Sequence, residues 1–292
     1  MRTAAFDYVR AATVAEAIEG LGDGRDARIL AGGQSLIPIM ALRLAAPEVL
    51  VDITRCPELL TFDVDGQVLT VGAAVTDRAL ENDPEVRSAH PLLVRTLSLI
   101  AHPEIRSRGT VCGSLVHADP AAELPALLLT TDGEVEVDGP QGARRIPASG
   151  FFDGPFTPAV EEGEMVVAAR FPLPGPTCGW AVEEVSRRPG DFAVAGVVCV
   201  VDLDGSGRCA AARLGLFGVA GTPVRSRGAE EVLMGEQPTE QVLDAAADAC
   251  FDGVDVQGDD VHTSADYRRL AGRAVVRRAL ATAVRSARGE PG

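Results

Sequence analysis

The hydrophobic and polar positions along the first 175 residues change repeatedly between the period of a strand and the period of a helix. One helix is predicted from Thr13 to Leu21, because Thr13 and Glu16 have the spacing of a capping box. A short strand then leads into a glycine pair, followed by an apolar segment at residues 36–44. Further strands are predicted at residues 49–53 and, after an Asp65-Gly66 turn typical of a hairpin, at residues 68–71.

The same mixture of periods continues to residue 171. The patterns predict helices at residues 76–81, 85–100 and 121–129, a glycine-rich loop at 103–120, and strands near 134–137 and 164–171.

Three prolines at positions 172, 174 and 176 mark the clearest break in the chain. Such a run can continue neither a helix nor a central strand, so we place a domain boundary there, between residues 1–175 and 176–292. Beyond it, strands are predicted at 177–185, 192–202 and 209–219, and helices from 226, over 239–250 and over 264–285. The predicted fold class is α+β, with a three-stranded C-terminal sheet covered by helices.

Composition excludes several classes of function. The formal net charge of −15 at pH 7 does not suit binding to nucleic acid or to an anionic membrane surface. All 27 basic residues are arginine, which excludes P-loop ATPases and Schiff-base enzymes, since both need a lysine. The six cysteines contain no CxxC pair, so we expect no iron–sulfur cluster and no metal site in this chain.

The sequence also bears on location. The N-terminal residues reach Asp7 and Arg10 without the apolar stretch of a secretory signal, and no apolar run approaches the length needed to span a bilayer. We therefore expect a cytoplasmic protein with reduced thiols and no membrane insertion.

The glycine pair at the end of the second predicted strand is the first candidate for chemistry. In Ala31-Gly32-Gly33-Gln34-Ser35-Leu36, two residues without Cβ let successive backbone N–H groups approach a phosphate closely, and the Gln34 amide and Ser35 hydroxyl add donors. The segment fits a diphosphate cradle, although an isolated Gly-Gly after a strand is more often only a turn.

A second glycine-rich run, at residues 105–125, is dense in hydroxyl groups and contains Asp119. Together with the first run it resembles the FAD-binding medium subunit of the molybdenum hydroxylases, the family that includes carbon monoxide dehydrogenase and the xanthine dehydrogenase FAD domain. Four blocks carry the resemblance, in order along nearly the whole chain: residues 31–53, 105–126, 188–193 and 264–271. Their co-occurrence is more specific than either glycine motif alone.

The resemblance implies a two-lobed FAD-binding domain of the vanillyl-alcohol oxidase (PCMH) type, with lobes at about residues 1–55 and 56–175. It also implies a set of cofactor-binding residues and no catalytic residue. The first segment would wrap the diphosphate, Thr110, Gly113 and Ser114 would approach the diphosphate or ribityl chain, and Asp119 would accept from sugar hydroxyls. The remaining residues implied at the flavin are His102, Ile105, His117, Arg188, Asp191 and Phe192.

Cys112 departs from the family pattern, which commonly has glycine there. A bulkier residue could weaken the approach of the second run to FAD. A covalent cysteinyl flavin is conceivable, but a buried cysteine that fills a small apolar space is the more frequent arrangement.

The resemblance further implies two partner chains, a small iron–sulfur subunit and a large molybdopterin subunit. Electrons would pass through FAD to NAD⁺, a quinone or oxygen. The main alternative is a stand-alone FAD-dependent oxidase or dehydrogenase that acts on a small organic substrate, with His102, His117 or Tyr267 as candidate bases. A third reading is a nucleotide-binding module that has lost electron transfer.

Overall fold

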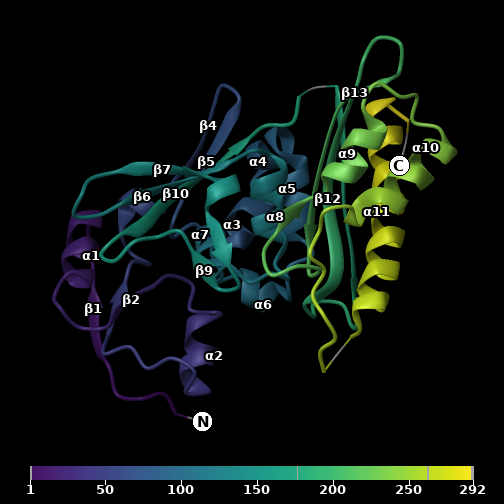
Figure 1. The fold of residues 1–292 in the computed structure, drawn as a ribbon. Helices are drawn as coiled ribbons and strands as arrows, with labels where there is room; N and C mark the ends of the chain where they lie inside the picture. Colours follow the sequence, from purple (N-terminus) through teal and green to yellow (C-terminus); the bar gives the residue numbers. More distant parts are fainter. Residues whose placement is uncertain (1, 176, 262, 291–292) are drawn as a thin grey trace.

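The computed structural model describes residues 2–175, 177–261 and 263–290. It contains two units side by side, an N-terminal unit (residues 2–175) with two sheets and several short helices, and a C-terminal unit (residues 177–290) with one long sheet and one long helix (Figure 1). The α+β class predicted from the sequence is confirmed.

The first sheet of the N-terminal unit is parallel, with the order β1-β3-β2. Its strands are β1 (Asp7–Arg10), β2 (Ala27–Leu30) and β3 (Val49–Asp52), and α1 (Val14–Leu21) and α2 (Leu36–Ala41) belong to the same lobe. The Thr13 hydroxyl accepts from the Glu16 N–H at 3.2 Å, which confirms the predicted start of α1. β1 had no clear sequence signal, since all four of its residues are exposed.

The second sheet is antiparallel, with the order β4-β5-β10-β6-β7. Its strands are β4 (Phe62–Asp65), β5 (Val68–Gly72), β6 (Glu134–Asp138), β7 (Arg144–Pro147) and β10 (Met165–Pro172), and a small hairpin joins β8 (Phe152–Gly154) to β9 (Thr157–Pro158). The helices of this lobe are α3 (Asp77–Asn82), α4 (Pro84–Ala89), α5 (Pro91–Leu97), α6 (Pro103–Arg106), α7 (Val111–His117) and α8 (Glu123–Thr130).

Two predictions about this lobe were wrong in detail. The single helix expected at residues 85–100 is two helices, because Pro91 cannot continue α4 and His90 instead caps α5 by accepting from the Leu93 N–H at 3.1 Å. The loop expected at residues 103–120 contains α6 and α7, since Thr110 caps α7 in spite of the glycines around it.

The C-terminal unit has an antiparallel sheet with the order β11-β12-β13-β14. Its strands are β11 (Cys178–Ser186), β12 (Ala193–Leu203), β13 (Cys209–Phe217) and β14 (Val224–Arg225), and its helices are α9 (Arg227–Leu233), α10 (Glu240–Asp248) and α11 (Ala265–Ala287). The three predicted strands are present. The fourth, β14, was not predicted, because a strand of two residues has no recognisable hydrophobic period. Short 3-10 turns lie at Pro57–Leu59, Ala148–Gly150 and Ala249–Phe251.

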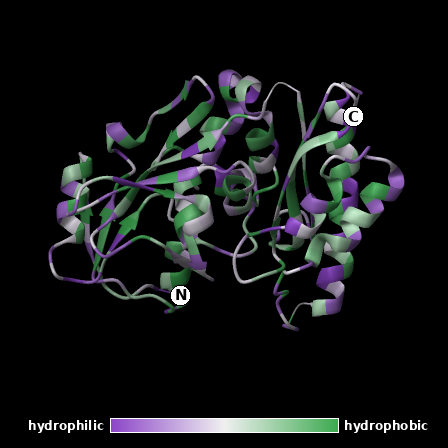
Figure 2. Ribbon diagram, turned by 45° about the horizontal axis from the view of Figure 1, so that its top comes forward, coloured by the Kyte–Doolittle hydropathy of each residue, from purple (hydrophilic) through white to green (hydrophobic). Residues whose placement is uncertain are grey.

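The long C-terminal sheet has a different cover on each face. α9, α10 and α11 pack on one face, where α11 lies against β11 and β12. The other face receives α8 from the N-terminal unit: a Cβ at Gly215 of β13 would lie 2.8 Å from the Ala126 carbonyl oxygen of α8. Side chains of this face, such as Val198 and Phe217, belong to the hydrophobic core of the N-terminal unit. Figure 2 shows the apolar strands at the centre of both units.

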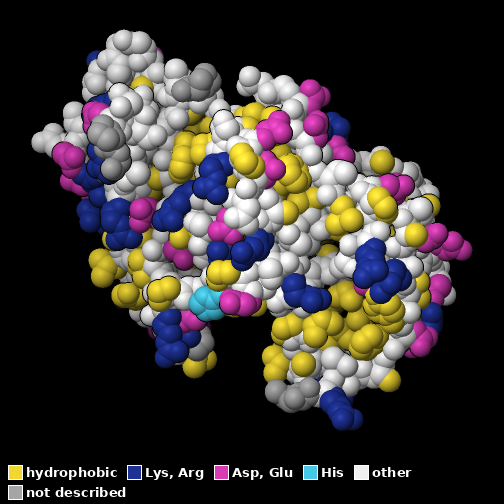
Figure 3. Space-filling view, turned by 180° about the vertical axis from the view of Figure 1, so that it is seen from behind, with side chains coloured by type: hydrophobic (Ala, Val, Ile, Leu, Met, Phe, Trp, Pro, Cys, Tyr) yellow, Lys and Arg dark blue, Asp and Glu magenta, His cyan; other side chains and the backbone are white. Residues whose placement is uncertain are grey.

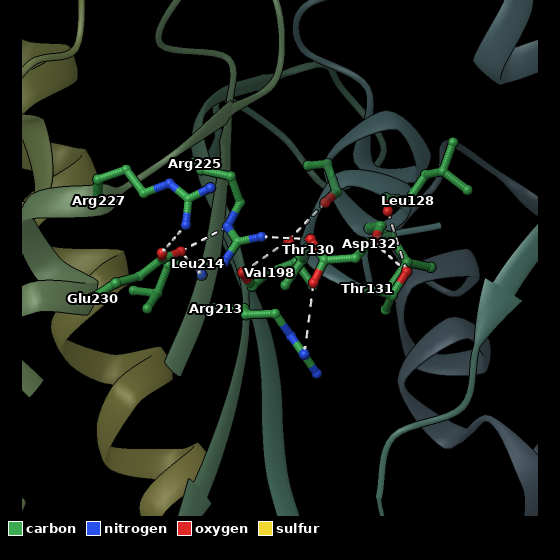
Figure 4. A network of polar contacts seen from close by, with 12 residues as sticks. Leu128, Thr130, Thr131, Asp132, Val198, Arg213, Leu214, Arg225, Arg227 and Glu230 are labelled. Carbon is green, nitrogen blue, oxygen red and sulfur yellow. Dashed lines mark hydrogen bonds and ion pairs between the residues drawn. The ribbon is translucent and has the colours of Figure 1, made fainter. Parts of the chain in front are cut away.

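Polar contacts at the far end of α8 also join the units (Figure 4). Asp132, which follows α8 in a left-handed conformation with φ 53°, accepts from Arg225 Nη1 at 2.9 Å. Arg225 Nε donates to Glu230 at 2.7 Å, and Glu230 also accepts from the Leu214 N–H at 2.9 Å. The buried Glu230 thus holds Arg225 in place for the contact with Asp132.

Within the described residues, no helix is both long enough and apolar enough to cross a membrane.

Candidate functional site

The first glycine segment remains a loop between β2 and α2. Its residues 31–36 are all partly buried, and Gly33 has φ 72°, a conformation that favours glycine. Within the described chain, the backbone N–H groups of residues 32–36 have no acceptor, and the Ser35 hydroxyl makes no cap bond to α2. Gln34 Nε2 donates to the Gly32 carbonyl oxygen at 3.2 Å. The loop therefore presents a run of free donors, which is what a phosphate requires.

The second run meets this loop directly. A Cβ added at Gly32 would lie 2.8 Å from the Gly109 Cα and 2.8 Å from the Arg108 carbonyl carbon. Only a residue without a side chain fits at this crossing, so the two glycine segments, 76 residues apart as Gly32 and Arg108, form one site.

The polar groups of the second run are organised by α7. Thr110 Oγ1 accepts from the Gly113 N–H at 3.1 Å, so this N–H is already used inside the protein. The Ser114 hydroxyl has no hydrogen-bond partner among the described residues. Asp119 Oδ1 accepts from the Ala121 N–H at 2.9 Å, which leaves Oδ2 available beside His117.

His117 lies at the end of α7, against Phe156. The two rings are 5.1 Å apart between centroids, and His117 Nε2 is 3.9 Å from Asp119 Oδ2. Burial lowers the pKa of His117, while the Asp119 carboxylate opposes this shift. His117 is therefore neutral at pH 7 and can donate one hydrogen bond and accept another.

The C-terminal unit reaches the site through the connection between β11 and β12. Gly190, with φ 84°, packs on His102, so that a Cβ at Gly190 would lie 2.6 Å from His102 Cε1. Phe192 follows on the same connection and is 71% exposed. Gly190 therefore places the connection between β11 and β12 beside His102, which precedes α6. Within the second run, the Ile105 carbonyl oxygen of α6 accepts from the Gly109 N–H at 2.7 Å.

Cys112 is fully enclosed at the start of α7. Its sulfur lies 3.6 Å from the Val71 carbonyl oxygen of β5, and burial raises the pKa of the thiol to about 12. A neutral, enclosed thiol is a poor nucleophile, so the side chain acts as a small apolar filler on the inner face of α7.

Sequence reasoning missed two buried carboxyl groups, Asp77 and Glu123, and a half-buried one, Glu184. Burial raises the pKa of Asp77 to about 7 and that of Glu184 to about 7. Burial, and then the neighbouring Glu184, raise the pKa of Glu123 to about 8. Glu123 lies within the block that carries the resemblance, but acids at the first position of a helix are usually exposed, so no local pattern indicates its burial.

Seen from behind, the molecule is hollowed between the lobe that contains β1, β2 and β3 and the rest of the chain (Figure 3).

In the parts of the chain that the structure describes, no three His, Cys, Asp or Glu side chains are grouped as metal ligands.

Comparison with known proteins decides the family. The profile for the FAD binding domain in molybdopterin dehydrogenase matches residues 4–174, and that for the CO dehydrogenase flavoprotein C-terminal domain matches residues 180–283. The chain belongs to the FAD-binding medium subunits of the molybdenum hydroxylases. Its cofactor is FAD, and it is a flavoprotein subunit of an oxidoreductase. The comparisons thus favour this function over that of a stand-alone oxidase or dehydrogenase.

Members of this family are similar over their whole length. The chain is 39% identical over 289 residues to the 6-hydroxypseudooxynicotine dehydrogenase complex subunit alpha of Paenarthrobacter nicotinovorans, covering 99% of this chain and 97% of that one. It is 39% identical to the carbon monoxide dehydrogenase medium chain of Hydrogenophaga pseudoflava, covering 94% and 96%. Quinoline 2-oxidoreductase from Pseudomonas putida 86 has a chain that superposes with a TM-score of 0.94 at 35% identity, covering 98% and 99%.

Proposed function

We propose that this chain relays electrons in a three-chain molybdenum hydroxylase, between iron–sulfur clusters on a small partner subunit and an external acceptor. The observation that carries the proposal is the crossing of the two glycine segments at Gly32, beside a run of free N–H donors, in a chain that belongs to the family. FAD, when bound, accepts single electrons and passes them on in pairs, which suits such a junction.

The residues fit the cofactor by their chemistry. The free N–H groups of residues 32–36 and the Ser35 hydroxyl would bind the diphosphate, and Ala31 and Leu36 would bound that loop. Ser114 and Asp119 Oδ2 would bind the ribityl or ribose hydroxyls. Thr110 and Gly113 would act mainly by fixing the start of α7, since they bond to each other.

The isoalloxazine end of the site would be formed by both units. His102 and Ile105 would fix the second run, while His117 would offer one polar ring atom. Arg188 would stabilise negative charge on the reduced flavin, Asp191 would orient the connection, and the exposed Phe192 would cover one face of the ring. The buried Glu123 adds a carboxyl group that can donate when protonated.

We further propose that the division of the chain lies at residues 171–176, between residues 1–175 and 176–292. The ends of the two matching profiles, at residues 174 and 180, support this position. Relatives such as the nicotine 6-hydroxylase medium subunit are named as parts of multi-chain enzymes, and the large partner would carry molybdopterin, in keeping with the matched FAD binding domain in molybdopterin dehydrogenase. The acceptor (NAD⁺, a quinone or oxygen) and the cytoplasmic location remain predictions.

The proposal is tested in two steps. The purified chain is incubated with FAD, freed of unbound nucleotide, and its absorption is recorded; one oxidised flavin per chain is expected. The chain is then expressed with the cysteine-rich and molybdopterin-type chains encoded beside it. Substrate should bleach the flavin of the complex and leave the flavin of the isolated chain oxidised. Bleaching of the isolated chain by an organic substrate would instead support a stand-alone oxidase.

A further inference from the structure

Asp77 lies directly behind the crossing of the two glycine segments. It is the first residue of α3 and only 3% exposed, and its N–H donates to the Gly109 carbonyl oxygen at 2.9 Å. A Cβ at Gly109 would lie 2.7 Å from Asp77 Oδ2. Since the Gly109 Cα is also in the tight crossing with Gly32, a single residue separates this carboxyl group from the proposed diphosphate loop.

The charged and titratable groups around Asp77 do not neutralise it. Glu81 lies one turn further along α3, Arg106 comes from α6, Cys112 from α7 and Glu123 from α8. The cation among these four is already engaged: Arg106 binds both carboxylate oxygens of Glu81, at 3.0 Å each, and the Ile100 carbonyl oxygen at 2.8 Å. Asp77 Oδ1 is buried and has no hydrogen-bond partner among the residues that the structure describes.

A diphosphate on the other side of Gly109 would make this position still less suitable for a negative charge. Residues 31–36 carry no charged side chain, so the first segment adds no cation to screen the interaction. Repulsion between like charges in a poorly solvated region favours the neutral form of the acid. Burial already places the pKa of Asp77 at about 7, so a further rise changes its charge at neutral pH.

We propose that Asp77 is a positioning residue that takes up one proton from solvent as FAD binds, so that its neutral carboxyl group stays packed against Gly109 beneath the diphosphate. This inference rests on the proposed function, because it needs FAD in the glycine loop. The balance is simple: apoprotein with an ionised Asp77, FAD and a proton give the complex with a protonated Asp77. Affinity should then fall as pH rises through the neutral range.

The experiment is isothermal titration of the full-length chain with FAD at pH 7.5, in buffers that differ in ionisation enthalpy. The slope of observed heat against that enthalpy counts protons. Wild type should take up about 0.5 proton per FAD, and its Kd should rise roughly 5- to 10-fold from pH 6 to pH 9, as expected for a pKa rise of about one unit. Asp77→Asn should take up less than about 0.1 proton, with a Kd that changes less than about twofold.

Glu184→Gln is the control, because Glu184 is a half-buried acid of β11, in the other unit, with a similarly raised pKa. It should retain most of the uptake. Equal uptake in wild type and Asp77→Asn, or loss of uptake only in Glu184→Gln, would refute the role of Asp77 and leave the proposed function intact. A wild-type chain that binds no FAD would refute both.

Infrared difference spectra of the wild type keep the test independent of how well the variant folds. Addition of FAD should increase the absorption of protonated carboxyl groups. No increase, together with no proton uptake by the wild type, would overturn the proposal.

Discussion

The two glycine segments look alike in sequence and differ in how the protein uses them. Within the described chain, residues 32–36 keep their backbone donors free, whereas residues 103–120 contain α6 and α7 and use the Gly113 N–H internally. The acids beside them differ too. Asp52, at the end of β3, is hydrogen-bonded by Thr54 and Tyr8, while one carboxyl oxygen of Asp77 has no hydrogen-bond partner in the described part of the chain.

The difference indicates a division of labour. The first segment has free backbone donors, and the second packs against it at the crossing of Gly32 with Arg108 and Gly109. Gly32 of the first segment combines this close packing with free donors around it, whereas Gly109 and Gly113 of the second segment are engaged inside the protein, so a glycine motif alone does not reveal which role it has. Four changes would break or sharpen this contrast.

The largest effect is expected from Gly32→Val, which places a side chain in the crossing of both segments. Backbone atoms of Arg108 and Gly109 cannot move aside independently. Because the loop must open, we expect FAD affinity to fall at least about 100-fold, or about 2.7 kcal/mol. Fluorescence titration with FAD measures it. Gly150→Ala is the control, since a Cβ there meets nothing within 4 Å; similar losses in both variants would contradict the argument.

The pH dependence of stability should separate the acids of the two segments. Burial opposes the shift at Asp52, but hydrogen bonds from Thr54 and Tyr8 outweigh it and lower the pKa, so its contribution is already complete near pH 5. The raised pKa values of Asp77 (about 7) and Glu123 (about 8) stabilise the fold at low pH, and this contribution is lost as pH rises through them.

Urea unfolding of the apoprotein between pH 6.5 and 8.5 measures this pH dependence of stability. The free energy of unfolding should fall with rising pH, each pKa unit corresponding to about 1.4 kcal/mol. Buried His90, whose pKa burial lowers to about 4, is neutral in the folded chain, so it contributes only a small opposite change near pH 6.5, where the unfolded chain still binds a proton. Asp77→Asn should flatten the curve, whereas Asp52→Asn should leave its slope unchanged.

A smaller effect is expected from Thr110→Ala, which removes the cap of α7. We expect a loss of about 1 kcal/mol in unfolding free energy. We also expect roughly tenfold weaker FAD binding, because the start of α7, next to the first segment, becomes less rigid. Thr239→Ala removes the cap of α10, far from the site, and should lower stability without affecting FAD. Equal FAD affinity in the two variants would assign Thr110 a purely structural role.

The smallest effect is expected from Cys112→Ala. The thiol is buried and neutral, so its loss should cost about 1 kcal/mol or less and leave FAD affinity unchanged. Acid precipitation should release all flavin from both wild type and variant. Flavin retained on the wild-type pellet, and absent from that of the variant, would show a covalent bond to Cys112.

Much of this architecture could be predicted from local patterns. The start of α1, the three long C-terminal strands and α11 follow from caps and periodicity. β1 and β14 could not be found, since an exposed four-residue strand and a two-residue strand carry no period. The glycine pair indicated a candidate phosphate loop in the first segment, which remains a prediction. The burial of Asp77 and Glu123 depends on helices that pack against them from other parts of the chain, and no local pattern contains this information.

The contact of α8 with the C-terminal sheet has a consequence for how the chain can be divided. If residues 177–290 were made alone, the face of β12 and β13 that carries Val198 and Phe217 would lose its cover and be exposed to water. Such a fragment should aggregate, and a protease cut in the proline-rich linker should leave two pieces that copurify. The linker resembles a boundary between independent domains, but the two units share one core. A chimera of two relatives should therefore take α8 and the C-terminal sheet from the same parent.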